Sequence, residues 1–141
     1  DYKEFMGWVF EKIAKKFLWK TRLPLKPVKI GRQWGKTRKG ETYEIDLIAY
    51  SRKGDIAAFE VKWKTLNHRD TIRTLNKLKE KLENIKAKGK THIGIIAKEI
   101  RRKKEIKEKE PLIFDLKDIE KTLGNKNLPK TSTTKKYSQQ S

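Results

Sequence analysis

Residues 44–49 and 59–62 read Glu-Ile-Asp-Leu-Ile-Ala and Phe-Glu-Val-Lys, and both stretches have the composition of β-strands. Their apolar residues are largely β-branched or aromatic, which favours a pleated, half-buried surface. The Lys-Gly-Asp sequence at 53–55 lies between them and has the chemistry of a turn. We therefore predict that the two stretches form a β-hairpin.

Acidic side chains lie in the middle of both predicted strands. Because side chains alternate across a strand, we expect Glu44, Asp46 and Ile48 to share one face. Glu60 and Lys62 should share a face of the neighbouring strand for the same reason. A carboxylate between apolar neighbours is costly unless it is paired or binds a metal. The hairpin is thus predicted to bring two or three carboxylates and one lysine together.

The spacing of these residues resembles a known signature. Asp46, followed fourteen positions later by Glu60-Val61-Lys62, is similar to the motif of the PD-(D/E)XK nuclease superfamily. Ile45 stands where many members of the superfamily have proline. The resemblance implies a restriction-endonuclease-like α/β fold, with a mixed central sheet flanked by helices in the order α-β-β-β-α-β.

A longer resemblance covers roughly the first hundred residues. Residues 31–35, which read Gly-Arg-Gln-Trp-Gly, together with the acidic motifs at 44–46 and 60–64, resemble the nuclease-like domain of unknown function at the C-terminal end of archaeal P-loop ATPases. Archaeal Holliday-junction resolvases are more distant relatives of the same design. This resemblance implies DNA, duplex or branched, as a partner and an ATPase module in a longer protein. The chain itself has no Gly-rich phosphate loop, so we do not expect it to bind ATP.

The resemblance also implies a metal centre that cleaves phosphodiester bonds. Asp46, Glu60 and the carbonyl group of Val61 would hold Mg²⁺ or Mn²⁺. Lys62 would orient or deprotonate the attacking water and stabilise the charge of the transition state. A structural ion pair without catalytic function is the alternative for these three charged residues.

Two further glutamates are candidates near this centre. In relatives of the fold the first helix often contributes an acid, and Glu11 is the matching residue here. The alternative for Glu11 is an i,i+4 pair with Lys15, which would contribute only about 0.3–0.5 kcal/mol. Glu44 is a secondary candidate, as a ligand, a water-positioning group or a structural partner.

The net charge of the 141-residue chain is +19, from 37 Lys and Arg against 18 Asp and Glu. A thermophile surface is enriched in both signs of charge, whereas cations are in twofold excess here. The excess therefore favours a polyanionic partner. The expected nucleic-acid contacts are Arg32, Lys36, Arg38, Lys39, Lys64, Arg69 and Arg73.

Two of the residues in the first predicted strand allow opposite interpretations. Arg32 and Trp34 could contact a phosphate and a base or sugar. Alternatively, Arg32 pairs with Glu44 and Trp34 belongs to the core, and for Trp34 we favour the core.

Apolar spacing predicts the remaining elements. Helices are expected at 2–19, 67–87 and 115–123, strands at 28–34, 91–97 and 112–114, a basic loop at 35–40 and an exposed helix or excursion at 100–110. We predict one domain over residues 1–123 and a basic, disordered tail over 124–141.

Composition narrows the remaining classes of function. The chain has no cysteine and no apolar run long enough to span a bilayer, so we expect a cytoplasmic protein that does not bind membranes. A second copy of the chain is a further candidate partner. Besides a nuclease, a silent DNA-docking or regulatory module and a protein-interaction domain stay open, because an intact motif is necessary for cleavage but not sufficient.

Overall fold

The computed structural model describes residues 1–124. The elements follow in the order α1 (Tyr2–Lys20), β1 (Pro27–Lys36), β2 (Thr42–Ser51), β3 (Ile56–Leu66), α2 (His68–Leu82), β4 (Thr91–Ile100), α3 (Lys103–Lys107), β5 (Ile113–Phe114) and α4 (Leu116–Leu123). The first six elements confirm the predicted order α-β-β-β-α-β. The predicted tail lies outside the described residues, apart from Gly124.

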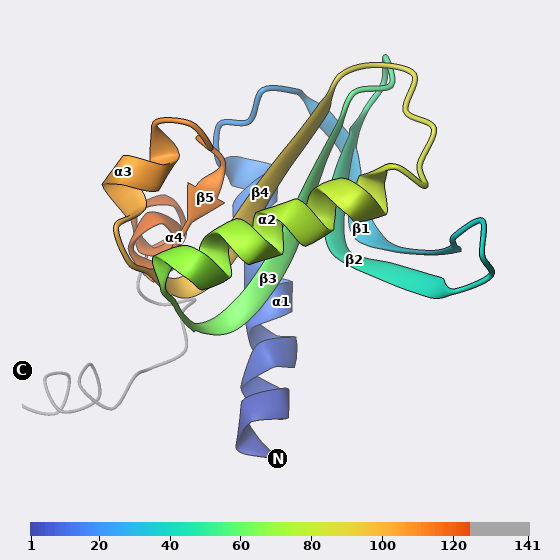
Figure 1. Cartoon of the computed structure of the whole chain (residues 1–141). Helices are drawn as coiled ribbons and strands as arrows, with labels where there is room; N and C mark the ends of the chain where they lie inside the picture. The colour runs from blue at the N-terminus through green and yellow to red at the C-terminus, as the bar shows by residue number, and fades with distance from the viewer. Residues whose placement is uncertain (125–141) are drawn as a thin grey trace, which may run out of the picture.

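One mixed sheet with the strand order β1-β2-β3-β4-β5 forms the centre of the molecule (Figure 1). The pairs β1–β2 and β2–β3 are antiparallel, whereas β4 runs parallel to both β3 and β5. β4 thus lies inside the sheet, as its continuous apolar run predicts. None of the helices within residues 1–124 is long and apolar enough to cross a membrane.

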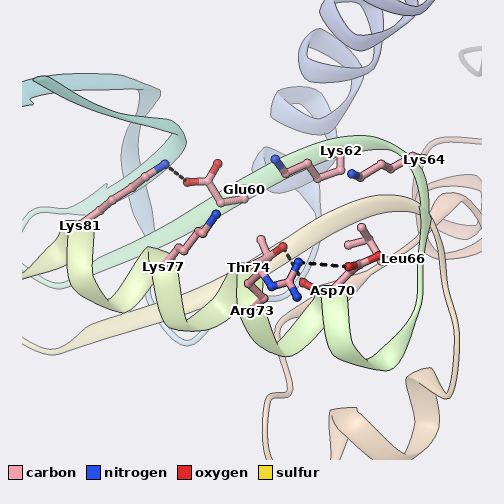
Figure 2. A pocket seen from close by; sticks show the side chains of 9 residues that line it. All are labelled: Glu60, Lys62, Lys64, Leu66, Asp70, Arg73, Thr74, Lys77 and Lys81. Carbon is pink, nitrogen blue, oxygen red and sulfur yellow. Dashed lines mark hydrogen bonds and ion pairs between the residues drawn. The ribbon is translucent and has the colours of Figure 1, made fainter.

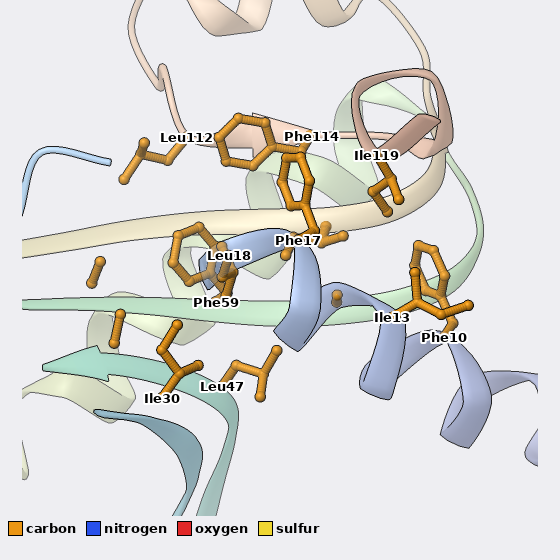
Figure 3. Close-up of a cluster of buried hydrophobic side chains, with 14 of the residues drawn as sticks. Phe10, Ile13, Phe17, Leu18, Ile30, Leu47, Phe59, Leu112, Phe114 and Ile119 are labelled. Atoms are coloured by element: carbon orange, nitrogen blue, oxygen red, sulfur yellow. The ribbon is translucent and has the colours of Figure 1, made fainter. Parts of the chain in front are cut away.

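Helix α1 covers one face of the sheet. It begins at Asp1, whose side chain accepts a hydrogen bond from the Lys3 backbone N–H at 2.7 Å. Phe10 and Phe17 pack with Phe59 of β3 in the larger apolar cluster, which α4 completes through Ile119 (Figure 3). Burying an aromatic side chain of this kind contributes about 1.5–3 kcal/mol.

Helix α2 covers the opposite face. Asn67 caps its start by accepting a hydrogen bond from the Asp70 backbone N–H at 2.8 Å. Leu78 packs against Ile48 and Ala58 of the hairpin, and α3 adds Ile106 to a neighbouring cluster on β4. The sheet is therefore sandwiched between α1 with α4 and α2 with α3 (Figure 1).

Several of the predicted boundaries were wrong, including the end of the strand predicted over 91–97, which continues to Ile100. The helix predicted over 67–87 ends at Leu82, because the following chain turns to reach the β2–β3 hairpin, where the Gly89 N–H donates to the Gly54 carbonyl at 3.0 Å. Ile85 and Ala87 still pack on the core, which explains their helix-like apolar spacing. The predicted loop at 35–40 was also too long, since Gly35 and Lys36 continue β1 and pair with β2.

Candidate functional site

The site forms where β2 and β3 separate. Their pairing runs from Tyr50–Ile56 to Leu47–Phe59 and stops there, one residue before Asp46 and Glu60 would lie opposite each other. The Val61 N–H, which no longer has a strand partner on this side, donates to Asp46 Oδ2 at 2.8 Å. A side chain thus replaces the ladder hydrogen bond, and the two acids of the predicted motif meet at this fork.

A β-bulge in β2 aims Asp46 into the fork. Between the pairs Gly31–Ile48 and Gln33–Ile45, β2 advances one residue more than β1. Ile45 and Ile48 consequently pack in the same cluster, although they would face opposite sides of a regular strand. Bulges re-aim side chains and end strand pairing in this manner.

The bulge corrects one prediction from the sequence. Glu44 does not share a face with Ile48, because Ile45 takes that place. Instead Glu44 accepts a hydrogen bond from the Arg32 guanidinium at 2.5 Å, and the same guanidinium also pairs with Glu11 of α1. The alternative in which Arg32 pairs with Glu44 is therefore the one that the structure shows, and Arg32, rather than Lys15, is the partner of Glu11.

Asp46 lies between two acidic neighbours. Burial raises the pKa of Glu11, and the charge of Asp46 raises it further, whereas the bond to Arg32 opposes this shift. Burial also raises the pKa of Glu60 to about 7, again with a contribution from Asp46 and against the opposing charge of Lys81. Glu11 and Glu60 therefore ionise less readily than ordinary glutamates, as expected where several carboxylates lie close together.

Glu60 is buried, with 6% of its surface exposed, and its partner is a residue that the sequence did not single out. Lys81 of α2 donates to Glu60 Oε1 at 2.9 Å and to the Glu44 carbonyl at 2.7 Å. One ammonium group therefore links α2 to both strands of the fork. A signal was present in the sequence, because Arg73, Lys77 and Lys81 recur every four residues and hence lie on one side of α2.

A basic cleft of about 200 Å³ opens between β3 and α2 beside these carboxylates. Figure 2 shows Lys62 and Lys64 along β3 and Lys77 and Lys81 along α2, with Glu60 among them. Arg73 also lines the cleft, where it pairs with Asp70 at 3.9 Å. Glu60 and Lys62 thus share the α2 face of β3, as predicted.

The other predicted nucleic-acid contacts lie elsewhere. Arg38 and Lys39 lie in the connection between β1 and β2, beyond Lys36 at the end of β1. Arg69 is exposed on the first turn of α2 and does not line the cleft. Trp34 is 66% exposed, so the prediction that it belongs to the core was wrong.

The donor set fits a single divalent cation. Within residues 1–124 no group of three or more His, Cys, Asp or Glu side chains is arranged to hold a metal ion. Mg²⁺ seldom uses such a cage, however, and is usually bound by one or two carboxylates and several waters. Asp46 and Glu60 supply two interacting carboxylates beside an open cleft, which meets this requirement.

Residues 1–74 match the model of DUF234, a family described as "Archaea bacterial proteins of unknown function". The chain belongs to this family. The matched part of the DUF234 chain includes α1, the hairpin and the start of α2, and hence Glu11, Asp46, Glu60 and Lys62.

A curated relative extends the match beyond that segment. The "Uncharacterized protein MJECL04" of Methanocaldococcus jannaschii is 41% identical over 126 residues, which cover 84% of the DUF234 chain and 27% of that protein. The chain therefore spans about a quarter of the length of this relative.

Solved structures can be superimposed on part of the DUF234 chain, with low sequence identity. The apo form of EndoMS is 20% identical with a TM-score of 0.42, over 79% of this chain and 44% of that one. A repair endonuclease from Pyrococcus abyssi is 19% identical with a TM-score of 0.40, over 82% of this chain and 46% of that one.

Proposed function

We propose that this chain is a DNA-binding domain that cleaves phosphodiester bonds with Mg²⁺ or Mn²⁺, as an endonuclease domain of an archaeal ATPase-type protein. The observation that carries the proposal is the fork between β2 and β3. There Asp46 accepts a hydrogen bond from the Val61 N–H beside the buried Glu60, and Lys62 follows Glu60 on the same face of β3. An ATPase module in a longer protein and a second copy of the chain are the protein partners that we propose.

Each residue at the fork has a chemical task in this proposal. Asp46, Glu60 and the Val61 carbonyl would hold the cation, which when bound supplies an activated water and neutralises charge on the phosphoryl oxygens. Lys62 orients the attacking water or accepts its proton, and its ammonium form stabilises the charge that develops in the transition state. Arg32 keeps Glu11 and Glu44 in place beside Asp46.

The basic cleft supports a role in binding the phosphate backbone. Lys64, Arg73 and Lys77 line it, and Lys36, Arg38 and Lys39 extend the positive charge along the outer part of β1 and β2 (residues 32–44), which we call the β1–β2 arm. Such cations neutralise phosphates and release counterions, which provides most of the non-specific affinity for DNA. Arg69, which is exposed on α2, would contact the backbone outside the cleft.

A catalytically silent DNA-docking or regulatory module is the second candidate, and one observation favours it. The acids already have cationic partners within the chain, because Lys81 pairs with Glu60 and Arg32 pairs with both Glu11 and Glu44. Acids that are neutralised in this way need no metal ion for the stability of the fold.

The two candidates differ in the effect of isosteric substitutions. Wild type, Asp46→Asn, Glu60→Gln and Lys62→Ala should be incubated with labelled linear, branched and single-stranded DNA, with and without Mg²⁺ or Mn²⁺. If the domain is a nuclease, Asp46→Asn and Glu60→Gln lose metal affinity and cleavage but still bind DNA, because they retain shape and remove only charge. Lys62→Ala loses cleavage and retains the metal.

Asp70→Asn is the matched control, since Asp70 lines the same cleft but pairs with Arg73, away from the fork. It should cleave like wild type. Unchanged cleavage by Glu60→Gln would contradict the catalytic assignment. A wild type that binds DNA but cuts no form of it with either metal would support the docking module, and melting curves of each variant separate loss of activity from loss of folding.

A further inference from the structure

One exposed face of β1 carries an aromatic side chain between two cations. Arg32, Trp34 and Lys36 alternate along the strand and are all exposed. The residues between them point the other way, since Gln33 accepts a hydrogen bond from the Tyr50 hydroxyl at 2.8 Å and Gly35 lies against the Tyr43 ring. With about 3.4 Å per residue, the three side chains stand about 7 Å apart in a row.

The exposure of Trp34 does not by itself indicate a site, because single exposed apolar residues are common on protein surfaces. Its neighbours provide the second observation. The Arg32 guanidinium lies 5.8 Å from the centre of the indole ring, and Lys36 lies two residues beyond Trp34 along β1. Trp34 is 66% exposed, so the ring lies beside a cation and much of its surface can still contact an additional planar group.

The row formed by Arg32, Trp34 and Lys36 begins next to the acids of the fork. Arg32 bonds Glu11 and Glu44, the two acids that adjoin Asp46, and Trp34 pairs across the sheet with Glu44. Beyond Lys36 the row continues into the connection that holds Arg38 and Lys39. A nucleic-acid strand with one phosphate at Asp46 could therefore run outward along this arm, with cations at its phosphates and the indole at a base.

We propose that Trp34 stacks on an unpaired base, so that the site selects nucleic acid with a single-stranded or unpaired segment next to the phosphate at the fork. This inference rests on the proposed function, whose substrate class it narrows. In an intact duplex both faces of each internal base are covered by its neighbours, and an indole reaches such a face only where a base leaves the stack. Stacking of this kind contributes about 1–3 kcal/mol per base.

Binding should be measured for wild type, Trp34→Ala and Trp34→Phe on single-stranded, gapped and fully paired DNA, with EDTA present so that no cleavage occurs. We expect Trp34→Ala to bind single-stranded and gapped DNA about 5- to 150-fold more weakly and paired DNA within twofold of wild type. Trp34→Phe retains most of the affinity, because a smaller aromatic face remains. Trp19→Ala is the matched control, since Trp19 is 46% exposed and lies at the C-terminal end of α1.

The outcomes separate this inference from the proposed function. Equal losses on all three DNA forms would overturn it and assign the indole to the sugar-phosphate backbone. Unchanged binding by Trp34→Ala, with wild type binding normally, would overturn the inference alone. A wild type that binds none of the three DNA forms would overturn both.

Discussion

Glu60 should dominate the pH dependence of stability among the residues of the site. Its pKa rises from an ordinary value of 4.5 to about 7 in the folded chain, chiefly because it is buried. Between these two values the unfolded chain ionises this group and the folded chain does not, so the free energy of unfolding falls as the pH rises. The contribution of Glu60 to this free energy is constant below about pH 4.5 and levels off above about 7, after a loss of roughly 3 kcal/mol.

Urea denaturation of wild type and Glu60→Gln in EDTA, at a series of pH values, measures this contribution. Glutamine does not titrate, so the difference in unfolding free energy between the two proteins should change across the window from 4.5 to 7 and stay constant outside it. Asp70→Asn should follow wild type. Parallel curves for wild type and Glu60→Gln would contradict the raised pKa.

The sequence pointed to the acids that meet at the fork but not to their partners. Asp46 and Glu60 were recognisable because a carboxylate among apolar strand residues needs a specific reason. Lys81 was one of many lysines on α2, and only the rotation of that helix against the sheet places its side chain at Glu60. Trp34 was assigned to the core because hydrophobicity alone does not distinguish a buried aromatic residue from one exposed on an edge strand.

At the scale of elements, Lys81 is the polar link between α2 and the fork. Its ammonium group bonds both the Glu44 carbonyl of β2 and the Glu60 carboxylate of β3. Lys81→Met retains the aliphatic stem and removes the charge. We expect it to lower the free energy of unfolding by about 2 kcal/mol in EDTA, since Glu60 loses a partner but the lysine side chain is itself partly exposed.

Metal binding should respond in the opposite direction. Without the competing ammonium group, the carboxylates of the fork retain an uncompensated charge, so the rise in melting temperature on adding Mg²⁺ or Mn²⁺ should be larger for Lys81→Met than for wild type. Lys77→Met, one turn earlier on the same side of α2, is the control and should match wild type. An equal or smaller rise in Lys81→Met would show that Lys81 does not compete with the metal ion.

The types and order of the helices and strands could be predicted from the sequence better than their end residues and the faces that their side chains occupy. Apolar periodicity gave α1, α2 and the strand run of β4, because these patterns repeat over several turns or residues. The bulge in β2 has no such signature, since Ile45, Leu47 and Ile48 are all apolar and fit either register. That one extra residue turned Glu44 to the face opposite Ile48, so the predicted face of Glu44 was wrong.

At the scale of the whole molecule, two surfaces that carry several cations lie near the fork. One is the β3–α2 cleft with Lys64, Arg73 and Lys77, and the other is the β1–β2 arm with Lys36, Arg38 and Lys39. The sequence predicted the charge and its sign, but only the fold shows that both surfaces adjoin the same carboxylates.

If these six cations contact phosphates, the affinity for duplex DNA should fall steeply with salt, with a slope of about −5 in a plot of log K against log salt concentration. Replacing Lys36, Arg38 and Lys39 with glutamine should reduce this slope by about 2.7, because each lost phosphate contact removes about 0.9. The control is the triple replacement of Lys15, Lys16 and Lys20 with glutamine, which lowers the net charge equally on exposed positions of α1. The two variants carry the same net charge, so equal slopes would mean that DNA binding depends only on the total charge of the chain. A smaller slope in the arm variant alone would locate the contacts to the DNA backbone on the β1–β2 arm.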